Sequence, residues 1–251
     1  MRAYPHKPLA PIFQRNLATA IEELVRHNDV TPALLAERTD RFFPLNAKWG
    51  MECATRGYAL EMAKEDILRF FAESSWSFGK AIETNASIHV GDVAKHLSVA
   101  LVLRLEKTIE RLANLPRDRY AKSKVEFPEC VFLAEEAQAH IVMGRMEAAQ
   151  NSLKAGFAQV GEKGLPADVR EDVEPVLLIE KAILDGDWEG LNTGFALRQK
   201  GFIKRFSNPR VRNMAEGAMD VWALGLARMA LDRKLAITHP SVYVPVELLD
   251  A

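Results

Sequence analysis

The segment from Asn213 to Leu231 constrains the fold more than any other, because it is apolar or small at nearly every position. Two adjacent stripes at helical spacing run along it, formed by Met214, Ala218, Val221, Gly225 and Met229 and by Trp222, Leu226 and Ala230. A helix that is apolar nearly all round must be buried. The segment therefore predicts the central helix of a helical domain, capped by Ser207-Asn208-Pro209. Small residues such as Gly225 predict a close approach by neighbouring helices.

The rest of the chain also shows helical periodicity, with no useful strand alternation and no hairpin turn of the Asn-Gly type. We therefore predict an all-α fold of stacked helical hairpins, solenoid-like or in an irregular bundle, around the buried C-terminal helix. Residues 236–245 should form an extended, docked tail. The expected helices before the central one cover residues 11–28, 32–43, 47–62, 64–78, 92–115, 130–143, 146–159, 173–184 and 188–198. Pro44 and Pro116 are expected to end the helices before them.

The 251 residues predict a single helical domain, residues 1–251, with two lobes at 1–116 and 128–251. The polar, basic stretch 117–128 would join the lobes. The second lobe opens with two helices split at Gly144-Arg145, which look like a tetratricopeptide hairpin. A similar unit, split at Gly186-Asp187, follows 42 residues on. Since a regular tetratricopeptide array repeats every 34 residues or so, we expect stacked hairpins rather than a true repeat protein.

The overall charge argues against two classes of partner. A formal net charge of −1 gives no support for binding nucleic acid or an anionic membrane surface. The N-terminus lacks the apolar core of a signal peptide, and no apolar run approaches the length of a membrane span. Cys53 and Cys130 lie in no metal-binding pattern, and reduced thiols are expected. These features predict a cytoplasmic protein.

No catalytic, cofactor or metal motif is present, so no catalytic residue, cofactor or metal ligand is predicted. The nearest candidate is Glu136 with His140, four residues apart on one helix face, for which a surface hydrogen-bonded pair is the favoured interpretation. His89 and Asp92 are interpreted as a loop residue and a helix N-cap. Arg228 either packs its stem on the core with its head reaching water or helix carbonyls, or forms a buried ion pair.

Charge is unevenly distributed along the second half. Residues 168–189 hold eight acids against two bases, whereas 198–212 hold six bases and no acid. The two segments either neutralise each other across a hairpin, or one of them faces a partner. The acidic one contains a candidate partner-binding site that would suit a basic protein, formed by Asp185, Asp187, Trp188 and Glu189. For Trp188 itself, a place in the hairpin core is the favoured interpretation. Phosphate binding by the basic segment, with its two phenylalanines, is a weaker possibility.

The stretch from Asp220 to Leu249 resembles the C-terminal signature of the immunity protein 49 family of bacterial polymorphic toxin systems. In that pattern an acidic residue precedes a Leu-Gly/Ala-Leu-Ala-Arg helix, a short basic link, and a tail with proline, an aromatic residue, a second proline and Leu-Leu. The matching residues are Asp220, Leu224-Gly225-Leu226-Ala227-Arg228, Arg233-Lys234-Leu235, Pro240, Tyr243, Pro245 and Leu248-Leu249. Lys234 stands where the pattern has glycine, which puts the predicted helix end there in question.

The resemblance implies a cytoplasmic, non-catalytic immunity protein that binds a cognate toxin domain and blocks its active site or substrate access. The acidic segment hints at a basic, nuclease-like toxin. The alternative function is a helical-repeat adaptor or regulator that binds a peptide or protein. A third is an enzyme with a site at Glu136 and His140. The signature residues themselves are expected to hold the fold together rather than to touch the partner.

Overall fold

The computed structural model describes residues 1–5, 7–28, 32–84, 86, 88–89, 91–119, 127–238 and 241–249, without the side chains of residues 28 and 32–40. The described chain is all-α, as predicted, and contains one isolated β-bridge between Ser241 and Val244. No described helix is both long and apolar enough to span a lipid bilayer. The helices are α1 (Ala10–Asn28), α2 (Pro32–Ala59), α3 (Lys64–Glu83), α4 (Asp92–Val102), α5 (Glu106–Ala113), α6 (Glu129–Val142), α7 (Met146–Val160), α8 (Ala167–Asp185), α9 (Trp188–Phe206) and α10 (Val221–Asp232). Three 3₁₀ turns are η1 (Arg117–Arg119), η2 (Ala215–Gly217) and η3 (Val246–Leu248).

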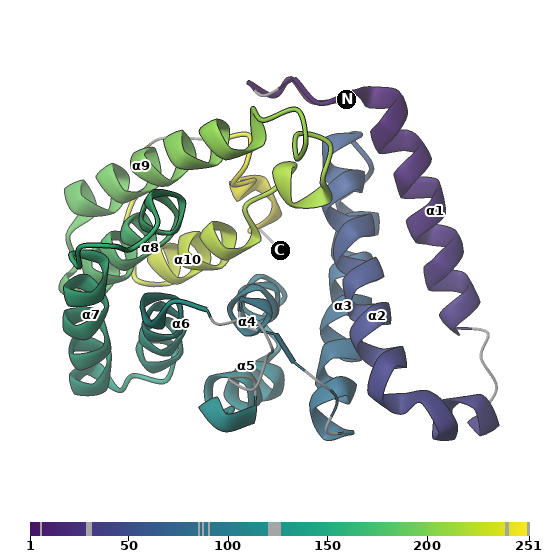
Figure 1. Cartoon of the computed structure of the whole chain (residues 1–251), viewed down its shortest axis with the longest axis horizontal. Coiled ribbons are helices and arrows are strands. Elements are labelled where there is room, and N and C mark those ends of the chain that lie inside the picture. The colour runs from purple at the N-terminus through teal and green to yellow at the C-terminus, as the bar shows by residue number, and fades with distance from the viewer. Residues whose placement is uncertain are drawn as a thin grey trace.

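The helices form two groups that meet at α4 and α10 (Figure 1). α1, α2 and α3 lie side by side at one end of the molecule, and α6 to α9 lie at the other. α4 packs on α3, α6 and α10. One continuous hydrophobic cluster includes Phe71 of α3, Leu97 of α4, Leu177 of α8 and Leu226 of α10. The core therefore spans the sequence from the first group to the last helix.

The predicted central helix is α10, and every residue from Val221 to Ala230 is buried. Its predicted start was wrong. The chain turns after Phe206, passes through η2, and begins α10 only at Val221. The cap is Asp220, whose Oδ1 accepts a hydrogen bond from the backbone N–H of Ala223 at 3.1 Å. A buried aspartate therefore caps the N-terminus of this helix, instead of the predicted Ser207-Asn208-Pro209 cap.

The predicted helix end before Pro44 was also wrong, because α2 runs through it from Pro32 to Ala59. An internal proline costs a helix about 3 kcal/mol. Tertiary contacts just beyond it offset that cost. Asn46 donates hydrogen bonds to Glu73 and Ser77, and Ser74 donates to the carbonyl of Ala47. The α2–α3 contact thus overrides the local signal.

The single helix expected over residues 92–115 is two helices, α4 and α5. Arg104 breaks it in the left-handed conformation, with φ of 54°, and Leu105 N–H donates back to the carbonyl of Ala100 at 2.9 Å. This six-residue hydrogen bond ends a helix in the Schellman manner. Because the turn keeps the leucines facing the core, hydrophobic periodicity continues through the break and hides it.

The predicted hairpins of the second half are confirmed as α6–α7 and α8–α9, with turns at Gly144 and Gly186. Both glycines have positive φ. The second hairpin is longer than predicted, since α8 starts at Ala167 and α9 continues to Phe206. α7 contacts α8, so the two hairpins lie next to each other. The last residues form η3, and Leu248 and Leu249 are buried, as expected for a docked tail.

Candidate partner-binding surface

The acidic and basic segments neutralise each other at one end of the α8–α9 hairpin. Glu171 forms an ion pair with Lys204 at 2.5 Å, and Asp172 with Arg205 at 2.9 Å. These pairs join the start of α8 to the end of α9. Of the two interpretations of the charge asymmetry, mutual neutralisation holds at this end of the hairpin. Lys204 and Arg205 of the basic segment are therefore engaged within the chain.

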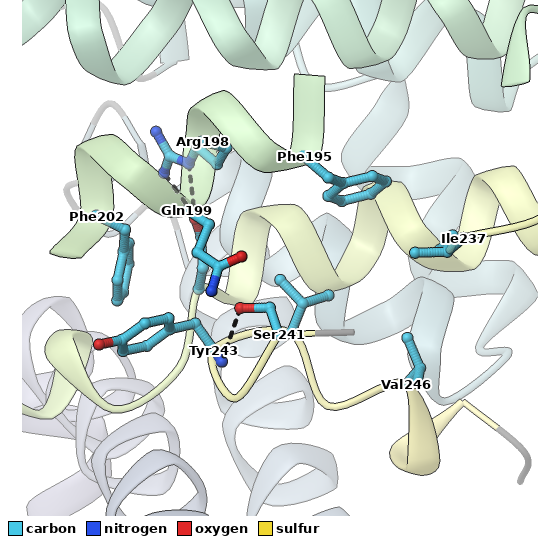
Figure 2. A pocket seen from close by; sticks show the side chains of 10 residues that line it. Phe195, Arg198, Gln199, Phe202, Ile237, Ser241, Tyr243 and Val246 are labelled. Atoms are coloured by element: carbon cyan, nitrogen blue, oxygen red, sulfur yellow. Dashed lines mark hydrogen bonds and ion pairs between the residues drawn. The ribbon is translucent and has the colours of Figure 1, made fainter. Parts of the chain in front are cut away.

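Arg198, which belongs to that basic segment, is buried rather than exposed (Figure 2). Its Nε donates to Asp220 Oδ2 at 2.6 Å, and its Nη1 donates to Asp172 Oδ1 at 2.7 Å. Burial alone would lower the pKa of Arg198, but the carboxylates of Asp220 and Asp172 outweigh it and raise the pKa. The guanidinium stays charged and ties α8 and α9 to the start of α10. The sequence analysis did not anticipate this buried ion pair.

A small cavity lies beside Arg198, between α9 and the C-terminal tail (Figure 2). Phe195 and Phe202 of α9 line it on one side, and Tyr243 and Val246 of the tail on the other. Its volume of about 10 Å³ is enough for one water molecule. The cavity therefore belongs to the packing of the tail and is too small for a ligand.

The other end of the hairpin holds the four predicted partner-binding residues, and they differ in what they do. Asp185 pairs with Lys181 on α8. Asp187 caps α9, accepting hydrogen bonds from Glu189 N–H at 3.1 Å and Gly190 N–H at 2.9 Å. Trp188 is 51% exposed, so its favoured placement in the hairpin core was wrong. Glu189 is exposed and forms no ion pair within the described part of the chain.

Trp188 and Glu189 lie at one end of an open groove of about 460 Å³ on the outer face of α9. Leu197, 43% exposed, lies further along it. One wall is the tail, held against α9 by Asn192, which donates to Ala236 O at 3.0 Å and accepts from Thr238 N–H at 2.7 Å. The groove is lined by Trp188, Glu189, Asn192, Thr193, Ala196, Leu197, Lys200 and Thr238. This groove contains two of the predicted partner-binding residues, Trp188 and Glu189.

A second cleft, of about 210 Å³, contains Glu136 and His140. No hydrogen bond joins them in the described structure. Glu136 instead faces Arg117 at 3.8 Å, and burial lowers the pKa of His140, whose Nδ1 has no described partner. Among the described residues no group of three or more His, Cys, Asp or Glu side chains is arranged to hold a metal ion.

Glu135, on the wall of the same cleft, is fully buried. Its Oε1 accepts hydrogen bonds from Gly91 N–H at 2.8 Å and Ala94 N–H at 3.3 Å, while its Oε2 has no described partner. Burial raises the pKa of Glu135 to about 8. Glu180 on α8 is also fully buried, and burial and the charge of Glu135 raise its pKa well above the usual range. Both carboxyls favour the protonated form in the folded state.

We expect the free energy of unfolding to fall as pH rises from about 4.5 towards 8. A carboxyl whose pKa is raised by folding stabilises the fold below its unfolded pKa and loses that contribution as pH rises through its folded pKa. For Glu135 the slope is about 1.4 kcal/mol per pH unit. Glu135→Gln keeps the acceptor oxygen and should flatten the profile. Urea unfolding between pH 5 and 8 measures this, with exposed Glu147→Gln as control, and equal slopes in both variants would contradict it.

The chain matches the family model of Immunity protein 49 over residues 48–248. The match covers most of the sequence, far beyond the C-terminal stretch that carries the resemblance. The chain belongs to the Immunity protein 49 family. No curated protein and no solved structure matches it.

The Immunity protein 49 signature at the C-terminus consists of structural residues. Asp220 caps α10 and pairs with Arg198. Arg228 is buried, pairs with Asp232, and donates from Nη1 to the carbonyl of Leu249 at 2.7 Å, so it holds the tail. Both interpretations of Arg228 were therefore partly right, since it bonds a main-chain carbonyl and also forms an ion pair with a half-exposed partner.

The conformation of Lys234 is one that favours glycine. Lys234 has φ of 62°, in the left-handed region that favours glycine, and Leu235 N–H donates back to Ala230 O at 3.0 Å. Glycine is the residue that the resemblance leads us to expect here, and Lys234 adopts this backbone conformation despite its side chain. Just before it, Arg233 donates to the carbonyls of Ile183 and Ile141, each at 3.1 Å, which crosslinks the ends of α8 and α6.

Proposed function

We propose that this protein binds a cognate bacterial toxin domain in the cytoplasm and neutralises it by covering its active site or its substrate-binding surface, without catalysis. Family membership supports an immunity role. We place the toxin-binding surface at the open groove because Trp188 is exposed there beside the unpaired Glu189. Tryptophan is a favoured interface anchor because it buries a large rigid area at low conformational cost.

The charge around Trp188 favours a basic partner. Asp185 and Glu189 are exposed near it. Among the described residues Asp185 is paired with Lys181, and Glu189 forms no ion pair. The carboxylate of Glu189 would attract a partner with a positive surface, and a nuclease that binds phosphates carries such a surface. Complementary charge mainly accelerates encounter, whereas burial of the Trp188 ring would slow dissociation.

Co-expression in bacteria with the toxin domain encoded by the adjacent reading frame tests the function. We expect the protein to restore growth of the producing cells and to co-purify with the toxin domain. The catalytically inactivated toxin domain should bind it as well, because the proposed mechanism needs no turnover. Growth arrest that persists in the presence of soluble, folded protein would rule the proposal out for that toxin.

Reversing the charge of Glu189 tests the acidic surface. We expect Glu189→Lys to slow association with the toxin domain about tenfold at low salt, with a smaller effect at high salt, since complementary rim charges act mainly on the association rate. Glu147→Lys is the matched control, because Glu147 is also exposed and also lies in the first turn of a helix. Surface plasmon resonance at two salt concentrations measures both rates. Identical association rates for the two variants would exclude this surface.

A further inference from the structure

The groove on α9 carries charges of opposite sign at its two ends, in addition to the acidic site. The exposed positions Glu189, Thr193, Ala196 and Lys200 follow one another at helical spacing, with Leu197 beside them. Lys200 lies eleven positions after Glu189, which is about 16 Å of helix. The stripe therefore carries an acid at one end, small and apolar groups in the middle, and a base at the other end.

The two end charges are unpaired, whereas several other charges of the hairpin are engaged within the chain. Glu171, Asp172 and Asp185 each form an ion pair within the hairpin, and Asp187 is engaged as the cap of α9. Neither Glu189 nor Lys200 forms an ion pair with any described residue. An exposed charge that the fold does not neutralise is available to a partner, and two of opposite sign specify an orientation.

We infer that this groove takes an amphipathic helix of the toxin, laid along α9 with a basic residue against Glu189 and an acidic residue against Lys200. Its apolar face would cover Leu197 and the ring of Trp188. The inference rests on the proposed function and adds the kind of element that is recognised and its direction. About three turns of the partner helix would match the length of the stripe.

The backbone around the groove favours a helical partner over a strand. Strand addition requires an exposed sheet edge with unpaired N–H and C=O groups. α9 uses its backbone groups within the helix, and the described tail residues beside it bond to Asn192. The described chain offers no sheet edge, so recognition along the stripe relies on side chains. The helix-in-groove mode, with anchors at every third or fourth residue, fits this arrangement.

Affinity and crosslinking with the toxin domain of the adjacent reading frame test the inference. Leu197→Asp should weaken binding roughly 30-fold, as expected for a central interface anchor, and Lys200→Glu about fivefold. Both side chains are exposed, so thermal unfolding should be unchanged. A photo-crosslinking residue at Ala196 should label one helical segment of the toxin, flanked by a base and an acid. The same residue at exposed Gln150 on α7 should label none.

The outcomes distinguish failure of the helix-in-groove inference from failure of the proposed immunity function. If the wild-type protein protects cells but Leu197→Asp and Lys200→Glu bind normally and Ala196 gives no crosslink, the inference is overturned and the immunity function stands. Crosslinks to an extended segment of the toxin, or between two copies of this chain, also overturn it. If the wild-type protein neither protects nor binds, the proposed function itself fails.

Discussion

Asp220→Ala should cost about 3–5 kcal/mol of the free energy of unfolding, because it strips a buried guanidinium of its main partner. The Asp220 and Arg198 side chains are 3% and 9% exposed, and they meet at 2.6 Å. The same carboxylate caps α10 through Ala223 N–H. Its loss therefore leaves a buried positive charge with only Asp172 to neutralise it, and also leaves the central helix uncapped. Urea-induced unfolding followed by circular dichroism measures the change.

Asp187→Ala provides the matched control. Asp187 also caps a helix and accepts two backbone hydrogen bonds, but it is exposed and has no buried partner. We expect a loss of about 1 kcal/mol there, the usual value of a cap. The difference between the two variants isolates the buried pair. If Asp220→Ala proves too unstable to purify, Asp220→Asn keeps a cap acceptor and should still lose most of the pairing energy. Equal losses for Asp220→Ala and Asp187→Ala would show that capping is all that Asp220 contributes.

Hydrophobic periodicity in the sequence predicted the helical segments well, but it failed at helix ends and at the break between α4 and α5. Helix ends at Gly144 and Gly186 were found because glycine at positive φ marks them. The ends at Glu61, Arg104 and Lys234 use the same left-handed conformation with residues that carry a side chain. A charged residue that adopts this conformation leaves no compositional signal, so the α4–α5 break was missed.

The wrong helix end at Pro44 and the missed burial of Arg198 both result from tertiary contacts. Local rules end a helix before proline, but the contacts of Asn46 and Ser74 across α2 and α3 exist only once the chain has folded. Likewise, Arg198 is one of six bases within residues 198–212. Only the fold places it against Asp220, 22 residues away. Charge counts along the sequence offered neutralisation between the two segments as one of two interpretations, and they did not show which pair is buried.

The candidate surface was predictable in part. Trp188 between acidic residues was identified from composition, and its exposure favours that interpretation over the hairpin core. The sequence did not separate Asp187, which caps α9, from Glu189, which is unpaired. The groove also depends on the tail, because Thr238 forms part of its wall through Asn192. Such long-range contacts have no pattern in the sequence.

Gly225→Ala should be the second severe variant, with a loss of about 3 kcal/mol or more. Gly225 on α10 faces Ser98 on α4, and an added methyl carbon would lie 2.5 Å from Ser98 Cα, with closer contacts to Ser98 Cβ and Oγ. Since the obstacle includes backbone, a side-chain rotation cannot relieve it, and the two helices must separate. Overpacking in a filled core usually costs 1–3 kcal/mol, and here it would also open the contacts around α10.

Gly79→Ala separates this steric effect from the general effect of replacing a helical glycine. A methyl group at Gly79 on α3 would meet only Arg111 Nη1, at an ordinary 3.6 Å. We expect it to stabilise the protein by about 0.5–1 kcal/mol, the difference in helix propensity between alanine and glycine.

Ser98→Gly added to Gly225→Ala removes the Cβ and Oγ but leaves the Cα, so it should recover only part of the loss. Because Ser98 Oγ also accepts from Gln138 and donates to Trp222 O, the two helices are held by a polar contact as well as by their close approach. Unfolding of the single and double variants in urea measures the coupling, and a Gly225→Ala protein as stable as Gly79→Ala would show that α4 and α10 do not pack this closely.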